Sequence, residues 1–110
     1  MPRLTDDQIN ARLPKLPGWT RTGQEAGRQG DTLTRTFAFR SYADAVAFVV
    51  RLAFEAEAND HHPDVAWSFR KVTVSWTTHS DNGITEKDFD GAAAAERIAS
   101  STPQSTAQKS

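Results

Sequence analysis

Apolar residues recur along this chain at one spacing typical of helices and another typical of strands. Over residues 41–58, spacings of three and four predict a long helix. Its expected buried stripe consists of Ala45, Phe48, Val49, Leu52, Ala53 and Ala56. Val46, Val50 and Phe54 form a second apolar strip beside it. This much apolar surface predicts that the helix is buried on more than one side.

Three segments have the sequence of a helix start, in which a Ser or Thr cap is followed three residues later by an acidic or amide residue. The pairs are Thr5 with Gln8, Ser41 with Asp44, and Thr85 with Asp88. Pro14 and the pair Pro17-Gly18 are expected to end the first helix. The last helix is expected to have a thin apolar face formed by Ala92, Ala93 and Ala99.

Alternating apolar positions predict strands between these helices. Trp19 opens a short extended segment, and a polar loop over residues 23–30 leads to a strand over 32–39. That strand alternates Leu33, Phe37 and Phe39 on one side, and Arg35 interrupts the pattern.

A second hairpin follows, in which the apolar residues change from odd to even positions. The change at Arg70-Lys71 predicts a two-residue turn there. The resulting register pairs Phe69 with Val72, Trp67 with Val74, and Val65 with Trp76.

The order helix, two strands, helix, two strands, helix predicts an α+β fold. We expect a four-stranded antiparallel sheet with about three helices packed on one face. The 110 residues fit one domain, placed at residues 1–100. The run SSTPQSTAQKS from Ser100 is too polar to pack, so residues 101–110 are predicted to be a disordered tail.

Composition narrows the classes of function. A net charge of -1 disfavours binding to nucleic acid. The absence of cysteine excludes disulfides, thiolate nucleophiles and cysteine-based zinc sites. There is no signal-like apolar stretch at the start and no apolar run long enough to span a bilayer, so a cytoplasmic protein without membrane contact is expected.

The three histidines are the candidates for chemistry. His61 and His62 are adjacent between the long helix and a strand, and His79 ends the partner strand of that hairpin. The predicted ladder brings His79 back toward the 61–62 loop. Imidazoles exchange protons near neutral pH, so such a cluster suits acid/base chemistry. The ordinary alternative is that these are solvated loop and strand-end residues.

A metal site is the other alternative for the same histidines. Glu57, Asp60 and Asp64 lie close enough in sequence to contribute to a zinc site. However, adjacent histidines on extended backbone point apart, and the sequence has no pair of histidines at helical ligand spacing. No metal is therefore expected.

The spacing of these residues resembles the signature of the pterin-4a-carbinolamine dehydratase family. The residues of this chain that match the signature are Glu57, His61-His62-Pro63, Phe69, His79 and Asp88. Five short segments also resemble the family, namely LPGW, HHPD, KVTV, TTH and GIT. The resemblance extends from Leu4 to Ile98. The chain departs from the pattern at Phe69-Arg70, where tyrosine and asparagine are common, and at Lys87, where arginine is common.

The resemblance implies dehydration of 4a-hydroxytetrahydropterin to quinonoid dihydropterin, without metal or cofactor. It makes His61 and His79 the acid/base pair, with the assignment of acid and base left open, and gives His62 the binding and orientation of the pterin. The implied substrate pocket comprises the three histidines together with Pro63, Thr78, Ser80 and Asp81.

Three acidic residues have supporting roles in this interpretation. Glu57 and Asp60 either fix the histidine rings through hydrogen bonds or are solvated at the helix end. Asp88 caps the last helix, and we expect its role to be architectural. Trp67 and Trp76 are expected to pack in the core rather than against the pterin.

The resemblance also implies a homodimer or homotetramer, in agreement with the two apolar strips on the 41–58 helix. The alternative to the enzyme is a non-catalytic pterin-binding, dimerisation or assembly module of the same fold. A metal-dependent hydrolase is a third hypothesis. The intact histidine set favours catalysis.

Overall fold

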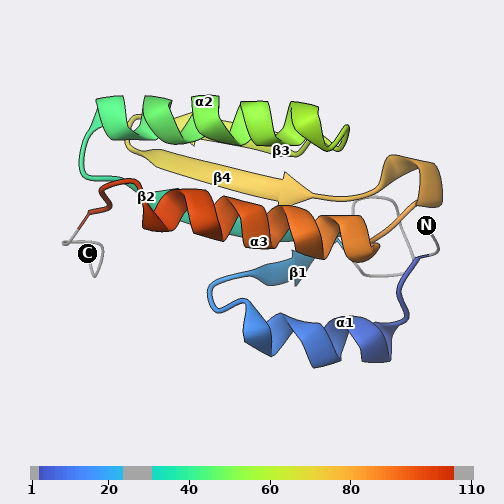
Figure 1. Ribbon diagram of the computed structural model, residues 1–110. Coiled ribbons are helices and arrows are strands. Elements are labelled where there is room, and N and C mark those ends of the chain that lie inside the picture. The colour runs from blue at the N-terminus through green and yellow to red at the C-terminus, as the bar shows by residue number, and fades with distance from the viewer. Residues whose placement is uncertain (1–2, 24–30, 106–110) are drawn as a thin grey trace.

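The computed structural model describes residues 3–23 and 31–105, and its elements follow the predicted order (Figure 1). The helices are α1 (Asp6–Arg12), α2 (Tyr42–Ala58) and α3 (Glu86–Ser100), with short 3-10 turns η1 (Leu13–Lys15) and η3 (His79–Asp81). The strands are β1 (Thr20–Thr22), β2 (Thr32–Ala38), β3 (Asp64–Ser68) and β4 (Lys71–Trp76). The loop predicted over residues 23–30 lies outside the described residues after Gly23.

The four strands form one antiparallel sheet in the order β1-β2-β4-β3. Its core side carries Leu33, Phe37, Val72, Val74 and Trp76, which are all buried. Figure 1 shows α2 and α3 side by side over the sheet, with α1 beside β1. The predicted fold class, a four-stranded antiparallel sheet with three helices, is confirmed.

The register predicted for the second hairpin is wrong by two residues. Trp67 pairs with Val72 and Val65 pairs with Val74, because the two-residue turn is Phe69-Arg70. Phe69 occupies the left-handed region there, with φ 53°. A shift by two residues leaves every side chain on the same face, so the apolar alternation did not reveal it.

Strand β3 is the outer edge of the sheet, and it is exposed along its whole length. Trp67 is therefore 41% exposed and stacks on Tyr42 with ring centroids 5.5 Å apart. The expectation that Trp67 lies in the core is wrong, whereas Trp76, on the inner strand β4, is buried.

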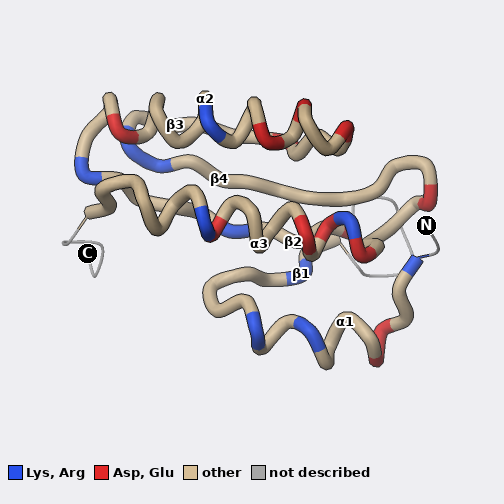
Figure 2. Tube along the Cα trace, in the orientation of Figure 1, with Lys and Arg blue, Asp and Glu red and all other residues tan. Residues whose placement is uncertain are grey.

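Helix α2 buries one apolar stripe against the sheet and leaves apolar residues exposed on its other side. Ala45, Phe48, Leu52 and Ala56 are buried as predicted, but Ala53 is exposed. Of the second strip, Phe54 is 74% exposed. Figure 2 shows long uncharged stretches along α2 between its few charged positions.

The helix starts follow their predicted caps, with one difference. Complete capping boxes form at Thr5 and Thr85. The Ser41 hydroxyl accepts from the Asp44 amide, but the Asp44 carboxylate accepts from that same hydroxyl at 2.9 Å rather than completing a box. On α3, Ala92 and Ala99 are buried, and Ala93, expected on the apolar face, is exposed.

The prediction that the polar segment after Ser100 does not pack is wrong for residues 101–105. Thr102 is buried and donates to the Ile98 carbonyl at 2.8 Å. Arg51 of α2 donates to the hydroxyls of Ser101 and Thr102. The segment then runs antiparallel to the end of β2, where the Ser105 amide donates to the Ala38 carbonyl. Residues 106–110 of the predicted tail lie outside the described residues.

Across the described ranges, none of the helices combines the length and the apolarity that spanning a bilayer would require.

Candidate active site

The end of α2 fixes the backbone of the first histidine. Asp60 is left-handed, with φ 51°. The Asp60 amide donates to the Glu57 carbonyl, and the His61 amide donates to the Ala56 carbonyl at 3.1 Å. This pair of bonds is the Schellman arrangement that closes a helix, and Asp is one of the few residues that tolerate the left-handed position. The helix end therefore determines where His61 begins.

The His61 ring meets a buried carboxylate from α3. His61 Nε2 lies 2.6 Å from Asp88 Oδ1. The Asp88 side chain has no exposed surface, and that of His61 is 13% exposed. Such a carboxylate–imidazole contact fixes both the orientation of the ring and the nitrogen that carries the proton.

Asp88 also serves the start of α3 and the end of β4. Its second oxygen, Oδ2, accepts from the Thr85 amide at 2.9 Å and from the Thr78 hydroxyl at 2.8 Å. The expectation that Asp88 caps the helix is confirmed, and its other oxygen contacts the His61 ring in addition. Asp88 thus joins the His61 segment to the chain immediately before His79.

An aromatic side chain supports the plane of the His61 ring. Trp76 stacks on His61 with ring centroids 5.4 Å apart and an interplanar angle of 22°. Both rings line a cavity of about 470 Å³ between the end of α2 and the side of α3, to which Lys87 and Asp90 also contribute. A larger hollow of about 980 Å³ lies at the β3–β4 turn; its lining includes Phe69 of the signature but none of the three histidines.

His62 faces a carboxylate on the outer surface. Its Nε2 lies 2.8 Å from Glu57 Oε1, with 56% of the His62 side chain and 80% of the Glu57 side chain exposed. Water screens such a pair, so it orients the ring more than it stabilises the fold. The Asp60 side chain has no hydrogen-bond partner within the described ranges, and Pro63 is half-buried beside His62.

The third histidine opens the turn η3. His79 is exposed, and its ring has no hydrogen-bond partner among the residues that the structure describes. Ser80 is exposed and Asp81 is half-buried. The turn is closed by paired backbone bonds between Thr78 and Gly83. Thr78, expected in the pocket wall, is buried, and its hydroxyl contacts Asp88 and Thr85.

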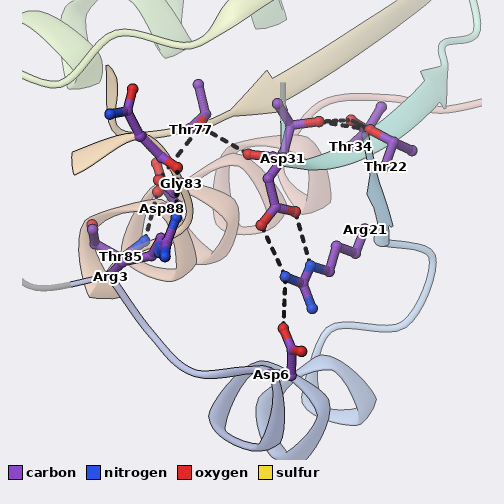
Figure 3. A network of polar contacts seen from close by, with 12 residues as sticks. Arg3, Asp6, Arg21, Thr22, Asp31, Thr34, Thr77, Gly83, Thr85 and Asp88 are labelled. Atoms are coloured by element: carbon purple, nitrogen blue, oxygen red, sulfur yellow. Dashed lines mark hydrogen bonds and ion pairs between the residues drawn. The ribbon is translucent and has the colours of Figure 1, made fainter. Parts of the chain in front are cut away.

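A polar network supports the chain on the other side of this turn (Figure 3). Arg21 of β1 binds both oxygens of Asp31, at 2.8 and 2.9 Å, and reaches Asp6 of α1 at 3.0 Å. The hydrogen bond to Asp31 raises the pKa of Arg21 above its ordinary value; burial opposes the rise, and Asp6 adds to it. The Asp31 carbonyl accepts from the Thr77 hydroxyl at 2.9 Å, which ties the network to the strand end before His79.

The structure therefore brings together His61, Asp88 and the strand end at Thr78, and it places Glu57 against His62. Trp76 as the support of the imidazole and Thr78 as a partner of Asp88 were missed by the sequence reasoning. Only the alternation of β4 points to them, because it places positions 76 and 78 on the same buried side. Among the described residues, no three His, Asp or Glu side chains converge as metal ligands would.

Comparison with known proteins gives consistent results. A family model described as "Pterin 4 alpha carbinolamine dehydratase" matches residues 2–98. A Roseiflexus sp. protein, provisionally named a pterin-4-alpha-carbinolamine dehydratase, is 50% identical over 88 residues, which cover 80% of this chain and 87% of the relative. A protein of Mycobacteroides abscessus with the same provisional name is 48% identical over 89 residues, covering 81% of this chain and 87% of that relative.

Two solved structures share the fold. A transcriptional coactivator/pterin dehydratase from Brucella melitensis has a TM-score of 0.79 and 35% identity, with 87% of this chain and 97% of that chain covered. A pterin dehydratase-like protein identified as a RuBisCO assembly factor in the alpha-carboxysome has a TM-score of 0.64 and 26% identity, with 77% and 93% covered.

Proposed function

The chain belongs to the pterin-4a-carbinolamine dehydratase family, and from this premise we propose that it converts 4a-hydroxytetrahydropterin to quinonoid dihydropterin and water. The C4a–oxygen bond breaks, and the departing hydroxide takes a proton from an acid. A base removes the proton from N5, and the electron pair left on N5 forms the C4a=N5 double bond. Proton transfer by positioned side chains is sufficient for this chemistry.

The observation that carries the proposal is the contact between His61 and Asp88. Asp88 Oδ2 accepts from the Thr78 hydroxyl and the Thr85 amide, as an ionised carboxylate does, and Oδ1 of such a carboxylate is an acceptor as well, so we assign the proton of a neutral His61 ring to Nε2. Nδ1 then has a free lone pair. This tautomer suits His61 for the removal of the N5 proton.

The roles of the other two histidines are assigned from their solvent exposure and their neighbours. His79 is exposed and lies immediately after Thr78, a partner of Asp88, so it is the candidate to protonate the leaving hydroxide. His62, oriented by Glu57, would bind and orient the pterin together with the adjacent Pro63. Backbone groups and side chains of Ser80 and Asp81 in η3 would complete the pocket.

Turnover of chemically generated carbinolamine tests the proposal. The wild-type chain is expected to accelerate the reaction above the buffer rate. Removal of a general acid or base lowers the rate by about 10²–10⁴-fold. His61→Ala and His79→Ala should therefore each cause a loss in that range.

His61→Gln serves as the matched variant. It keeps a hydrogen-bond donor toward Asp88 but cannot exchange a proton, so its melting temperature should stay nearer the wild-type value while its turnover is as low as that of His61→Ala. Wild-type rates in both His61→Ala and His79→Ala would overturn the assignment. Loss of activity on dialysis against a chelator would instead favour a metal-dependent reaction.

We also propose that the chain self-associates as a homodimer or homotetramer. The outward side of α2 carries exposed or half-buried apolar residues at Ala43, Val46, Ala47, Val50, Phe54 and Ala58. A helix that is apolar all round is normally buried all round. A second copy that places its own α2 against this surface would bury it.

The second candidate function is a non-catalytic assembly module. Two observations favour it: the similarity to a chain identified as a RuBisCO assembly factor, and the uncovered apolar side of α2. The turnover assay separates the two functions. A folded wild-type protein that binds a pterin analogue without accelerating dehydration would leave only the assembly function.

A further inference from the structure

Helix α3, which carries Asp88, contains a glycine in its interior, where other residues stabilise a helix better. Gly91 is six residues into α3, where glycine costs about 1 kcal/mol relative to alanine. Its φ is not in the left-handed region, and no turn requires it. The reason for glycine at this position must therefore be the space that a side chain would fill.

That space is occupied by the indole of Trp76. A Cβ atom at position 91 would lie 2.6 Å from Trp76 Cδ2 and 2.7 Å from both Cε2 and Cε3. Cδ2 and Cε2 are the atoms shared by the two indole rings, so a methyl group that meets all three atoms at nearly equal distance sits over the face of the ring. Helix α3 therefore packs its backbone directly on the indole face.

The indole cannot move without affecting the histidine. Trp76 is 2% exposed and has packed neighbours on the sheet, and it stacks on His61 at 5.4 Å. Protein interiors are close-packed, so displacement of a buried ring is passed to the groups that touch it. The group that touches it here is the imidazole assigned to the proton transfer.

We propose that Gly91 is a positioning residue for His61 and acts through Trp76. The absent side chain lets α3 set the position of the indole, and the indole sets the plane of the imidazole while Asp88 sets its rotation. This inference rests on the proposed dehydration, in which His61 must face the pterin. A small displacement of a reacting group is costly, since about 1 Å of misplacement can reduce the rate about 10²-fold.

Gly91→Ala tests the proposal. On helix propensity alone this change favours the fold, so any loss reports the contact with Trp76. We expect kcat to fall at least about tenfold with KM nearly unchanged, because the lost interaction belongs to the transition state. The ring-proton chemical shifts of His61 should also move, since the ring current of the stacked indole contributes to them.

A compensating change makes the test specific. Trp76→Phe in the Gly91→Ala background removes the fused ring that the methyl group meets and keeps an aromatic ring beside His61. The double variant should recover most of the lost kcat. As the matched control, Ala11→Gly makes an alanine-to-glycine change at an exposed position of α1 outside the 470 Å³ cavity, and it should leave kcat and the His61 chemical shifts unchanged.

Several results would overturn the proposal. One is a wild-type kcat with unmoved His61 shifts in Gly91→Ala. Another is a raised KM at constant kcat, which would show that the methyl group only fills the 470 Å³ cavity. A third is failure of Trp76→Phe to restore the rate of a folded Gly91→Ala chain.

If Gly91→Ala does not fold, Trp76→Leu decides the question. It removes the stacked ring from His61 and keeps an apolar side chain, so an unchanged kcat would overturn the proposal and a tenfold loss would support it. If the wild-type chain shows no dehydration at all, the proposed function fails. The His61 chemical shifts of wild type and Gly91→Ala then still decide whether Gly91 positions the ring.

Discussion

At the scale of single residues, Asp88 combines two tasks that usually belong to different side chains. One of its oxygens holds the start of α3 and the hydroxyl of Thr78, and the other holds the His61 ring. The carboxylate has no contact with solvent, so each of these bonds forms in a poorly screened environment. The geometry of the imidazole therefore depends on neighbours that themselves need never touch the pterin.

Thr78→Val tests this dependence. Valine keeps the β-branched shape and removes the buried hydroxyl that lies between Asp88 and Thr85. Leaving buried polar partners unsatisfied costs about 1–3 kcal/mol, so the free energy of unfolding should fall by that amount and turnover should fall with it. Urea unfolding and steady-state kinetics measure the two effects.

Thr73→Val is the matched control. Its hydroxyl bonds Thr36 at 2.7 Å on the side of the sheet away from the helices. Substitution there should change stability by no more than about 0.5 kcal/mol. Equal losses in the two variants would contradict a special role for the Thr78 hydroxyl.

At the scale of elements, the segment after α3 acts as a strap across the fold. Residues 101–105 bind Arg51 on α2 and then pair with the end of β2. The strap thus connects α3, α2 and the sheet at the end of the molecule where α2 begins. Its hydrogen bonds involve backbone groups, the hydroxyls of Ser101 and Thr102, and the side-chain amide of Gln104.

Comparison of a chain ending at Ser100 with one ending at Ser105 tests the strap. Loss of the buried Thr102 and of several hydrogen bonds should cost about 2 kcal/mol. For a domain of this size that corresponds to a fall in Tm of roughly 10 °C. Coincident melting curves for the two chains would show that the strap contributes nothing to stability.

The elements also show which parts of the structure a sequence can predict. Helix caps at Thr5 and Thr85 and the alternation of β2 and β4 are local patterns, and the structure confirms them. The hairpin register was missed because Phe69 adopts a left-handed turn position, which bulky aromatic residues rarely occupy. The strap was missed because the prediction of packed segments relied on the spacing of apolar residues, and this segment is polar.

The candidate site also contains residues that the sequence predicts and residues that it does not. The histidines and Asp88 are visible as a motif, because a family signature fixes their spacing. The supporting roles of Trp76 and Thr78 arise only when β4, α3 and the end of α2 meet, so spacing along the chain does not contain them.

At the scale of the whole molecule, the outward side of α2 leaves apolar side chains exposed. Phe54 is 74% exposed and Val50 is 47% exposed, whereas isolated soluble domains rarely leave contiguous apolar patches uncovered. The edge strand β3 adds Trp67 and Phe69 to the exposed aromatic area. Both features agree with the self-association proposed above.

Ala47→Glu tests that association. Ala47 is exposed on the outward side of α2, about one turn before Val50, and a buried unpaired carboxylate there would oppose a helix-to-helix contact. The variant should sediment as a smaller species than the wild type. Ala11→Glu, the same change at an exposed position of α1, should leave the mass unchanged. Identical masses for wild type and Ala47→Glu would contradict an interface at this surface.

The double duty of Asp88 has a consequence for how the protein responds to heat. The first turn of α3 is closed by a complete capping box and is buried at Ile84, Thr85 and Asp88, so it should open only together with the central strands. The imidazole then keeps its carboxylate partner up to the melting transition. Activity and the near-ultraviolet circular dichroism signal should therefore be lost at the same temperature on heating, and loss of activity several degrees earlier would show that this turn opens locally.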